Sequence, residues 1–194
     1  MALTAGSKAP DFTSKDENGN DVKLSDFRGK KLVLYFYPKD MTPGCTAESC
    51  NLRDNYKVLL KQGYEVLGVS TDSEKSQQKF IAKEKLPFRL LADTDKSLHS
   101  KFGTWVEKSM YGRKYMGTAR TTFVINENGV IEEVIEKVDT KNHTDQILKG
   151  SGTLPTKPVA KKVRSSAKKT VKKTVKKAAR KTANPLAGRA RKKK

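Results

Sequence analysis

Cys45 and Cys50 are the residues of this 194-residue chain whose type and spacing could do chemistry. They are its two cysteines, and they lie five positions apart in "YPKDMTPGCTAESC" (37 to 50), just after a Thr-Pro-Gly turn. A cysteine thiolate is a nucleophile and a metal ligand, and two thiols can form a disulfide. The pair therefore indicates catalysis, a metal site or simple burial.

The residues before Cys45 predict the start of a helix. Thr42 has the character of an N-cap, Pro43 suits the first helical position because its φ is already fixed, and Cys45 is then the third helical residue. Free backbone N–H groups and the helix dipole at that place favour a thiolate, which is the reactive form of a cysteine. The sequence therefore predicts a reactive Cys45.

The spacing of the two cysteines argues against a disulfide at rest. If the helix continues to Cys50, the separation of five residues gives a rise of about 7.5 Å and a Cα to Cα distance of roughly 8.7 Å. A disulfide requires less than about 7 Å between the Cα atoms. Joining the two sulfurs therefore requires the helix to unwind locally.

Two other uses of cysteine find less support. A zinc site needs four ligands, and the only histidines, His99 and His143, lie far along the chain. A C-x-x-C exchange motif is absent. We expect no metal and no cofactor, and the two histidines are most simply surface or capping residues without chemistry.

Apolar runs and the stretches between them predict the elements that position the cysteines. The runs are typical of strands covered on both faces, and strands that alternate with helices indicate an α/β sheet with parallel members. The strands are expected at 31–37, 64–70, 88–92 and 121–125, and the helices at 43–62, 73–85, 95–102 and 142–149. Asn-Gly turns in "DENGNDVKL" (16 to 24) and "FVINENGVIEEVIEKV" (123 to 138) predict hairpins that add antiparallel strands.

The charge divides the chain into two parts. Residues 1–156 carry 24 Lys or Arg against 21 Asp or Glu, whereas residues 157–194 carry 17 Lys or Arg and no acid. We predict a globular domain over 1–150 and a linker with a basic tail over 151–194. Self-repulsion should leave this tail disordered in isolation.

Three stretches carry a resemblance to a known family. The stretches "APDF" (9 to 12), "LSDFRGKKLVLYFYPKDMTPGCTAESCNLRD" (24 to 54) and "RTTFVINENGVI" (120 to 131) closely resemble peroxiredoxins of the bacterioferritin comigratory protein, or Prx Q, type. The P-x-x-x-T-x-x-C motif of that family is present as Pro38, Thr42 and Cys45. The resemblance covers roughly residues 3–150 and implies a thioredoxin-like α/β fold, with a central mixed sheet flanked by helices.

The resemblance also implies a mechanism. Cys45 would attack the peroxide and become a sulfenic acid, and Cys50 would condense with it to a disulfide that a thioredoxin-like donor reduces. Arg120 matches the family's active-site arginine, which would hold the thiolate and polarise the peroxide. Pro38 would shield the site from water.

Two side chains near Cys45 allow two interpretations each. The Thr42 hydroxyl could bond the peroxide or the sulfur, or it could cap the Cys45 N–H. Glu48 could orient Arg120, or it could be an ordinary acid near the start of a helix. Three aromatic residues are expected to pack beside the site and could contribute to a peroxide pocket: Phe102, Trp105 and Tyr111.

The basic tail has no place in the peroxiredoxin pattern. Its Lys-Ala-Thr-Val composition resembles linker-histone tails, and it predicts phosphate contacts with DNA or RNA. It could also be a solubilising extension, and membrane binding ranks lower because the apolar positions lack large anchors. The candidate contacts are Lys168, Lys169, Lys172, Lys173, Lys176, Lys177, Arg180 and Lys181.

The function expected from these observations is a thiol peroxidase that acts on hydrogen peroxide and small organic hydroperoxides and is recycled by thioredoxin. The competing classes are a nucleic-acid-binding protein with an inactive peroxiredoxin-like domain and a general thiol-disulfide oxidoreductase. The N-terminus lacks the apolar run of a signal peptide, and no segment approaches the roughly 20 apolar residues of a membrane span. We expect a cytoplasmic monomer, nucleoid-associated through its tail, or nuclear in a eukaryote.

Overall fold

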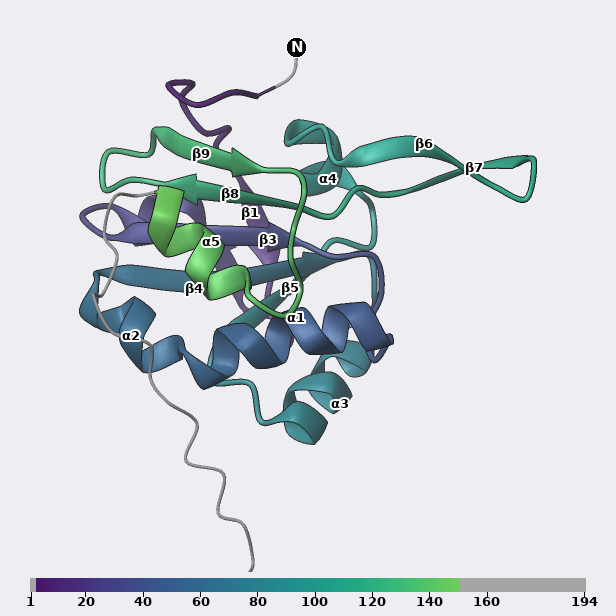
Figure 1. Ribbon diagram of the computed structural model, residues 1–194, viewed down its shortest axis with the longest axis horizontal. Helices are drawn as coiled ribbons and strands as arrows, with labels where there is room; N and C mark the ends of the chain where they lie inside the picture. Colours follow the sequence, from purple (N-terminus) through teal and green to yellow (C-terminus); the bar gives the residue numbers. More distant parts are fainter. Residues whose placement is uncertain (1–2, 151–194) are drawn as a thin grey trace, which may run out of the picture. The chain divides into compact units, whose positions relative to one another are not determined.

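A five-stranded mixed sheet forms the centre of the protein in the computed structural model, which describes residues 3–150 (Figure 1). The strand order is β5-β4-β3-β8-β9, with β3, β4 and β5 parallel and β8 and β9 antiparallel. The bounds are β3 (Lys31–Phe36), β4 (Tyr64–Ser70), β5 (Arg89–Ala92), β8 (Thr121–Ile125) and β9 (Ile131–Ile135). The four predicted strands and the β8–β9 hairpin are confirmed. The tail and its candidate contacts lie outside the described residues.

Five α-helices surround this sheet in the described part of the chain (Figure 1). They are α1 (Pro43–Asp54), α2 (Tyr56–Lys61), α3 (Glu74–Glu84), α4 (Ser97–Lys101) and α5 (His143–Gly150). The prediction of one helix over 43–62 is wrong, because the chain leaves the helical conformation at Asn55 (φ −106°, ψ 7°). At this end of α1 the Asn51 carbonyl accepts from both the backbone N–H of Asn55, over 3.2 Å, and its side-chain amide, over 2.8 Å.

The two faces of β3 contribute to two separate cores, as its uninterrupted apolar sequence predicts. On one face, Val33 and Tyr35 pack with apolar residues of α1, α2, α3 and α5. On the other, Leu34 and Phe36 pack with the N-terminal segment and α4. That segment contains the predicted first hairpin, β1 (Thr13–Lys15) and β2 (Asp21–Lys23), followed by a 3₁₀ turn, η1 (Leu24–Phe27). Within residues 3–150, no helix is both long and apolar enough to cross a membrane.

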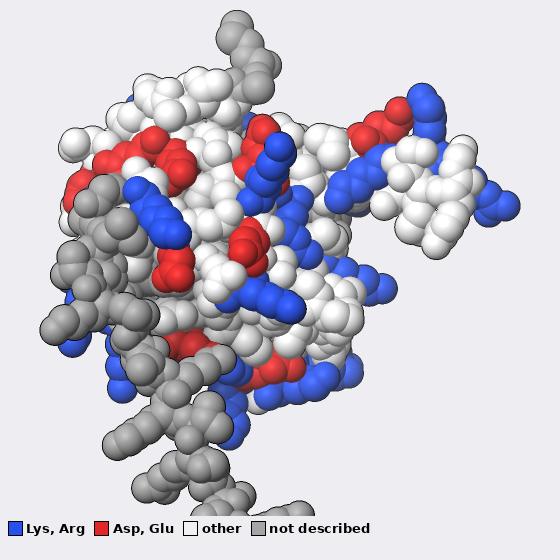
Figure 2. Space-filling view, in the orientation of Figure 1, with Lys and Arg blue, Asp and Glu red and all other residues white. Residues whose placement is uncertain are grey.

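A third hairpin, β6 (Trp105–Met110) and β7 (Arg113–Thr118), was not predicted. Its turn places Tyr111 at φ 51° and Gly112 at φ 77°, so a Tyr-Gly pair takes the positive φ values for which Asn-Gly is the usual signal. The hairpin extends away from the sheet, and basic side chains lie beside an uncharged patch on it (Figures 1 and 2). Tyr111 is 97% exposed, so its expected packing beside the site is wrong. Trp105 is half-buried, and Phe102 belongs to the core under Phe36.

Candidate active site

The loop between β3 and α1 leads directly to the helix turn that contains Cys45. Pro38 follows β3 and is half-buried. Buried Asp40 accepts a 2.7 Å bond from the Tyr37 hydroxyl, and its own N–H donates to Asp72 over 2.8 Å. Burial raises the pKa of Asp40 above its usual value. Met41 then takes a left-handed conformation (φ 57°), which these contacts stabilise and which turns the chain into α1.

Helix α1 begins as the sequence predicts. Thr42 is the N-cap in extended conformation, Pro43 is the first helical residue, and Cys45 is the third and only 1% exposed. The Thr42 hydroxyl donates to the Lys39 carbonyl over 3.0 Å and makes no side-chain cap bond. The interpretation of this hydroxyl as a cap of the Cys45 N–H is therefore wrong.

Arg120 contacts the Cys45 sulfur from the neighbouring strand. Because β8 pairs antiparallel with β3 and Thr121 lies opposite Phe36, the preceding Arg120 lies beside the end of β3. Its Nη2 donates to the Cys45 Sγ over 3.2 Å, and its Nη1 forms an ion pair with Glu48. The structure thus brings Cys45 and Arg120 together from 75 residues apart.

Glu48 is fully buried, and its ion pair favours the interpretation that it orients Arg120. Burial raises the pKa of Glu48 to about 7, against the opposing effect of the Arg120 charge. Burial disfavours the charge on Arg120 itself, but Glu48 and Cys45 outweigh this and raise the Arg120 pKa. Within residues 3–150 the second carboxylate oxygen, Oε1, has no hydrogen-bond partner, and the His143 Nε2 lies 3.8 Å from it.

Cys50 lies on the same uninterrupted helix, and both cysteines are free thiols. It is half-buried, and its Sγ donates to the Glu84 carboxylate of α3 over 3.5 Å. Burial and the Glu84 carboxylate raise the Cys50 pKa, although the Arg53 charge acts in the opposite direction. Cys50 is therefore held as a neutral thiol at neutral pH, away from Cys45.

His99 is a buried residue rather than a surface or capping residue, so that prediction is wrong. Its Nδ1 lies 2.5 Å from Asp93, and its Nε2 lies 3.0 Å from the Thr118 hydroxyl. Burial tends to raise the Asp93 pKa, but hydrogen bonds from His99 and Leu98 lower it to about 2. Because Thr118 lies two residues before Arg120, this network holds the end of β7 next to the site.

His143 is also fully buried, which contradicts the same prediction. Its Nε2 lies 2.9 Å from the Thr122 hydroxyl, and its Nδ1 lies 3.3 Å from the Gln146 side chain. Burial lowers the pKa of His143 to about 4, so the ring is neutral at pH 7. It lies at the start of α5, which packs against α1, and its ring contacts Thr122 of β8, so elements from two other parts of the chain surround it.

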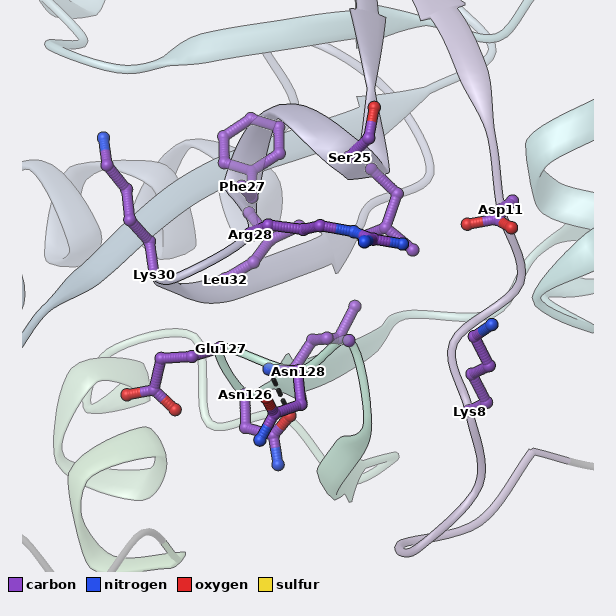
Figure 3. Close-up of a pocket in the computed structure, with 13 residues that line it drawn as sticks. Lys8, Asp11, Ser25, Phe27, Arg28, Lys30, Leu32, Asn126, Glu127 and Asn128 are labelled. Atoms are coloured by element: carbon purple, nitrogen blue, oxygen red, sulfur yellow. Dashed lines mark hydrogen bonds between the residues drawn. The ribbon is translucent and has the colours of Figure 1, made fainter.

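Two cavities differ in their relation to this site. One of about 460 Å³ is lined by apolar side chains that include Phe102, Val106, Phe123 and Val134, and by the charged side chains of Lys108, Arg120 and Glu136. The other, of about 20 Å³, lies near the start of β3, at the other end of that strand from Cys45, with Leu32, Arg28 and Asn126 in its wall (Figure 3). It has room for about one water and no cysteine or histidine in its lining. Only the larger cavity adjoins a residue of the candidate site.

Comparison with known proteins agrees with this geometry. Residues 5–134 match the AhpC/TSA family. The putative peroxiredoxin bcp of Coxiella burnetii is 47% identical over 148 residues, covering 76% of this chain and 98% of that protein. Peroxiredoxin Bcp of Escherichia coli K12 is 47% identical over 146 residues, covering 75% and 94%.

A solved structure of the Xanthomonas campestris bacterioferritin comigratory protein, studied for its alkyl peroxide reduction activity, superposes with a TM-score of 0.68. It is 36% identical and covers 71% of this chain and 88% of that one. The thioredoxin-like fold is shared with this structure. The chain therefore belongs to the AhpC/TSA family and is a peroxidase of its Bcp/PrxQ peroxiredoxin group.

Proposed function

We propose that Cys45 is the peroxidatic nucleophile and Cys50 the resolving thiol of this peroxidase. The observation that carries the proposal is the Arg120 guanidinium, which donates to the buried Cys45 sulfur while Glu48 holds its other nitrogen. A fixed cation at this place stabilises the thiolate and the negative charge that develops on the leaving oxygen. Because Cys45 and Glu48 are buried, this electrostatic effect is larger than it would be at the surface.

The proposed cycle balances in three steps. The Cys45 thiolate attacks one oxygen of ROOH, so an S–O bond forms, the O–O bond breaks, and RO⁻ leaves and takes up a proton as alcohol or water. Cys50 then gives up its thiol proton, its sulfur attacks the sulfenic sulfur, and the departing hydroxide takes up a proton and leaves as water while the disulfide forms. A dithiol donor such as thioredoxin supplies the two electrons that restore both thiols.

The proposed substrates are hydrogen peroxide and organic hydroperoxides. The apolar part of the 460 Å³ cavity beside Arg120 offers room for the R group of an organic hydroperoxide. The alkyl peroxide reduction activity of the Xanthomonas campestris relative supports the same substrate class. The Thr42 hydroxyl would turn from the Lys39 carbonyl to bond the peroxide, and Pro38 would limit the entry of water.

We also propose that the tail binds nucleic acid, because its 17 positive charges and lack of acidic residues favour contacts with phosphates. If about half of these charges meet phosphates of duplex DNA, the slope of log K against log salt should be roughly −7. Mobility shifts at several salt concentrations test this on the full chain and on a chain without residues 157–194. A shift that persists after deletion, or none for the full chain at low salt, would reduce the tail to a solubilising extension.

The peroxidase proposal is tested by peroxide consumption driven by thioredoxin and its reductase. Cys45→Ser should abolish turnover, because a serine hydroxyl does not ionise usefully at neutral pH even beside Arg120. Cys50→Ser should complete one peroxide reduction and then stop as a sulfenic acid, which a dimedone adduct detects. Turnover of Cys45→Ser at the wild-type rate would overturn the mechanism, whereas no turnover of the wild type itself would favour the alternative of an inactive domain with a nucleic-acid-binding tail.

A further inference from the structure

Helix α1 is attached to the rest of the protein mainly through polar contacts. Its buried residues are Cys45, Glu48, Ser49 and Leu52, so Leu52 is the one hydrocarbon side chain among them. Polar contacts can be exchanged for contacts with water at a modest net cost, whereas buried hydrocarbon cannot. The side chains that hold α1 therefore control how easily it unwinds.

Asn51, directly after Cys50, makes the most extensive of these contacts. Its Nδ2 donates to the Lys141 carbonyl over 2.6 Å. Its Oδ1 accepts from both the N–H and the hydroxyl of Thr144, each over 2.9 Å. One amide group thus connects the last turn of α1 to the N-terminal turn of α5, 93 residues away.

These contacts make Asn51 a cap of α5 supplied from another helix. The first N–H groups of a helix have no partner within it and need an outside acceptor. Thr144 is the second residue of α5, and the Asn51 Oδ1 accepts its N–H as an N-cap side chain would. Unwinding α1 would therefore uncap α5.

We propose that Asn51 is a positioning residue whose bonds to α5 set how fast Cys50 reaches Cys45. The inference depends on the proposed roles of the two cysteines. Cys50 cannot approach Cys45 on an intact helix, since five residues of helix keep the Cα atoms roughly 8.7 Å apart. Moving Cys50 displaces its neighbour Asn51, so the bonds to Lys141 and Thr144 must break first.

The rate of this release decides the fate of the sulfenic acid. While Cys45 waits as a sulfenic acid, a second peroxide can oxidise it to the sulfinic acid, and resolution by Cys50 competes with that reaction. Tight bonds at Asn51 favour the sulfinic acid, and loose bonds favour the disulfide. Asn51 thereby controls the resistance of the enzyme to overoxidation.

Stopped-flow kinetics of the full chain with hydrogen peroxide test this directly. In Asn51→Ala, disulfide formation should become on the order of fivefold to tenfold faster, because fewer hydrogen bonds must break. The sulfinic fraction per turnover, read by mass spectrometry, should fall by a similar factor, while the rate of sulfenic acid formation stays unchanged. Thr144→Val removes the hydroxyl donor to the Asn51 Oδ1 and keeps the backbone N–H donor, so it should act in the same direction with a smaller effect.

Amide exchange supplies a second readout with a matched control. Oxidation of the wild type should speed amide exchange at Thr144 and in the first turn of α5. In Asn51→Ala, the same amides should exchange faster even in the reduced protein. Arg53→Ala is the control, since the Arg53 Nη1 ties α1 to the Glu84 carbonyl of α3 over 2.6 Å and leaves the contact with α5 intact. In that variant the α5 amides should stay protected in the reduced state.

The outcomes separate this inference from the proposed function. If the wild type forms no Cys45–Cys50 disulfide, the resolving role of Cys50 is wrong and this inference fails with it. If the disulfide forms but Asn51→Ala and Thr144→Val both leave its rate and the sulfinic fraction unchanged, only the role of Asn51 is overturned. Equal α5 exchange in the two redox states of the wild type would also overturn it.

Discussion

Strand β3 and helix α1 follow one another in the chain but are stabilised in different ways. Five of the six residues of β3 are buried, and all five are aliphatic or aromatic. The buried part of α1 consists of a thiol, a carboxylate, a hydroxyl and one leucine. Apolar burial holds β3 between β4 and β8, whereas directional polar contacts hold α1 on one face of the sheet.

This difference suits the proposed cycle. The strand must keep Pro38 and the start of α1 in place while the helix reacts, and a closely packed apolar core resists rearrangement. The helix must hold the thiolate beside Arg120 and later unwind, and polar contacts permit both states because water can replace them. The following predictions test this contrast, from the largest expected effect to the smallest.

Phe36→Ala should produce the largest loss of stability. The Phe36 ring is fully buried and packs against His99, Phe102 and Phe123. Truncation of a buried phenylalanine typically costs about 3–5 kcal/mol, because it removes apolar contacts and leaves a cavity. Urea unfolding of residues 1–156 measures the loss, with Phe36→Leu as the milder control. A loss under about 1 kcal/mol would show that β3 is not the rigid part.

Arg120→Ala should leave the fold intact and slow the reaction of Cys45 with peroxide by roughly 10²–10³-fold, because it removes the charged donor to the sulfur. Single-turnover kinetics measure the rate constant, and circular dichroism checks the fold. Arg120→Lys keeps the charge but cannot contact Glu48 and Cys45 with two nitrogens, so it should be intermediate. An unchanged rate constant would assign the stabilisation of the thiolate to another group.

The pH dependence of stability should reveal two opposing groups at α1. Burial lowers the His143 pKa to about 4, so the unfolded state takes up a proton at a higher pH than the folded state does. The free energy of unfolding is therefore unaffected by this group above pH 6.5 and falls as the pH drops from 6.5 toward 4. Burial raises the Glu48 pKa to about 7, so the folded state holds a proton that the unfolded state has released, and stability falls as the pH rises from about 4.5 to 7. In the wild type the two trends partly cancel.

Single variants should separate these trends. In His143→Gln, stability should fall with rising pH between about 4.5 and 7, and in Glu48→Gln it should rise between about 4 and 6.5. The free energy of unfolding should change by on the order of 3 kcal/mol across each of these pH ranges. Urea midpoints at a series of pH values measure both. Parallel pH profiles for the wild type and the two variants would mean that neither buried group titrates differently on folding.

Ser49→Ala should have the smallest effect, although it breaks a direct contact between the two regions. The Ser49 hydroxyl lies 3.0 Å from the Tyr35 hydroxyl of β3, and both are buried. Removing one partner leaves the other unsatisfied and costs about 1–2 kcal/mol, whereas removing both in Ser49→Ala with Tyr35→Phe should restore most of it. A double-mutant cycle by urea unfolding measures this coupling. A coupling energy of zero would mean that the contact between the Ser49 and Tyr35 hydroxyls does not help to hold α1 against β3.

The parts of the protein that depend on local pattern could be predicted from sequence. The apolar runs predicted the central strands, the Asn-Gly turns predicted two hairpins, and Thr42 and Pro43 predicted the start of α1 with Cys45 in its first turn. Each of these features depends on neighbouring residues, so the information lies within a short stretch. The domain boundary after residue 150 and the behaviour of the tail stay predictions.

Contacts between distant residues could not be predicted in this way. Nothing near His143 or His99 indicated burial, because each is covered by elements from elsewhere in the chain. The bonds from Asn51 to Thr144 exist only because α5 packs against α1. The β6–β7 hairpin was missed because Tyr111 takes a conformation that glycine or asparagine usually provides.

By itself, the sequence determined the strands, the helix that carries both cysteines, and the motif of Pro38, Thr42 and Cys45, since short-range periodicity and capping specify these. The tertiary structure decided how the site is held together. It placed Arg120 on the Cys45 sulfur through the pairing of β3 with β8, and it buried Glu48 beside His143. Such contacts join residues that are 70 or more positions apart, and their strength comes from exclusion of water, which arises only when the whole domain has folded.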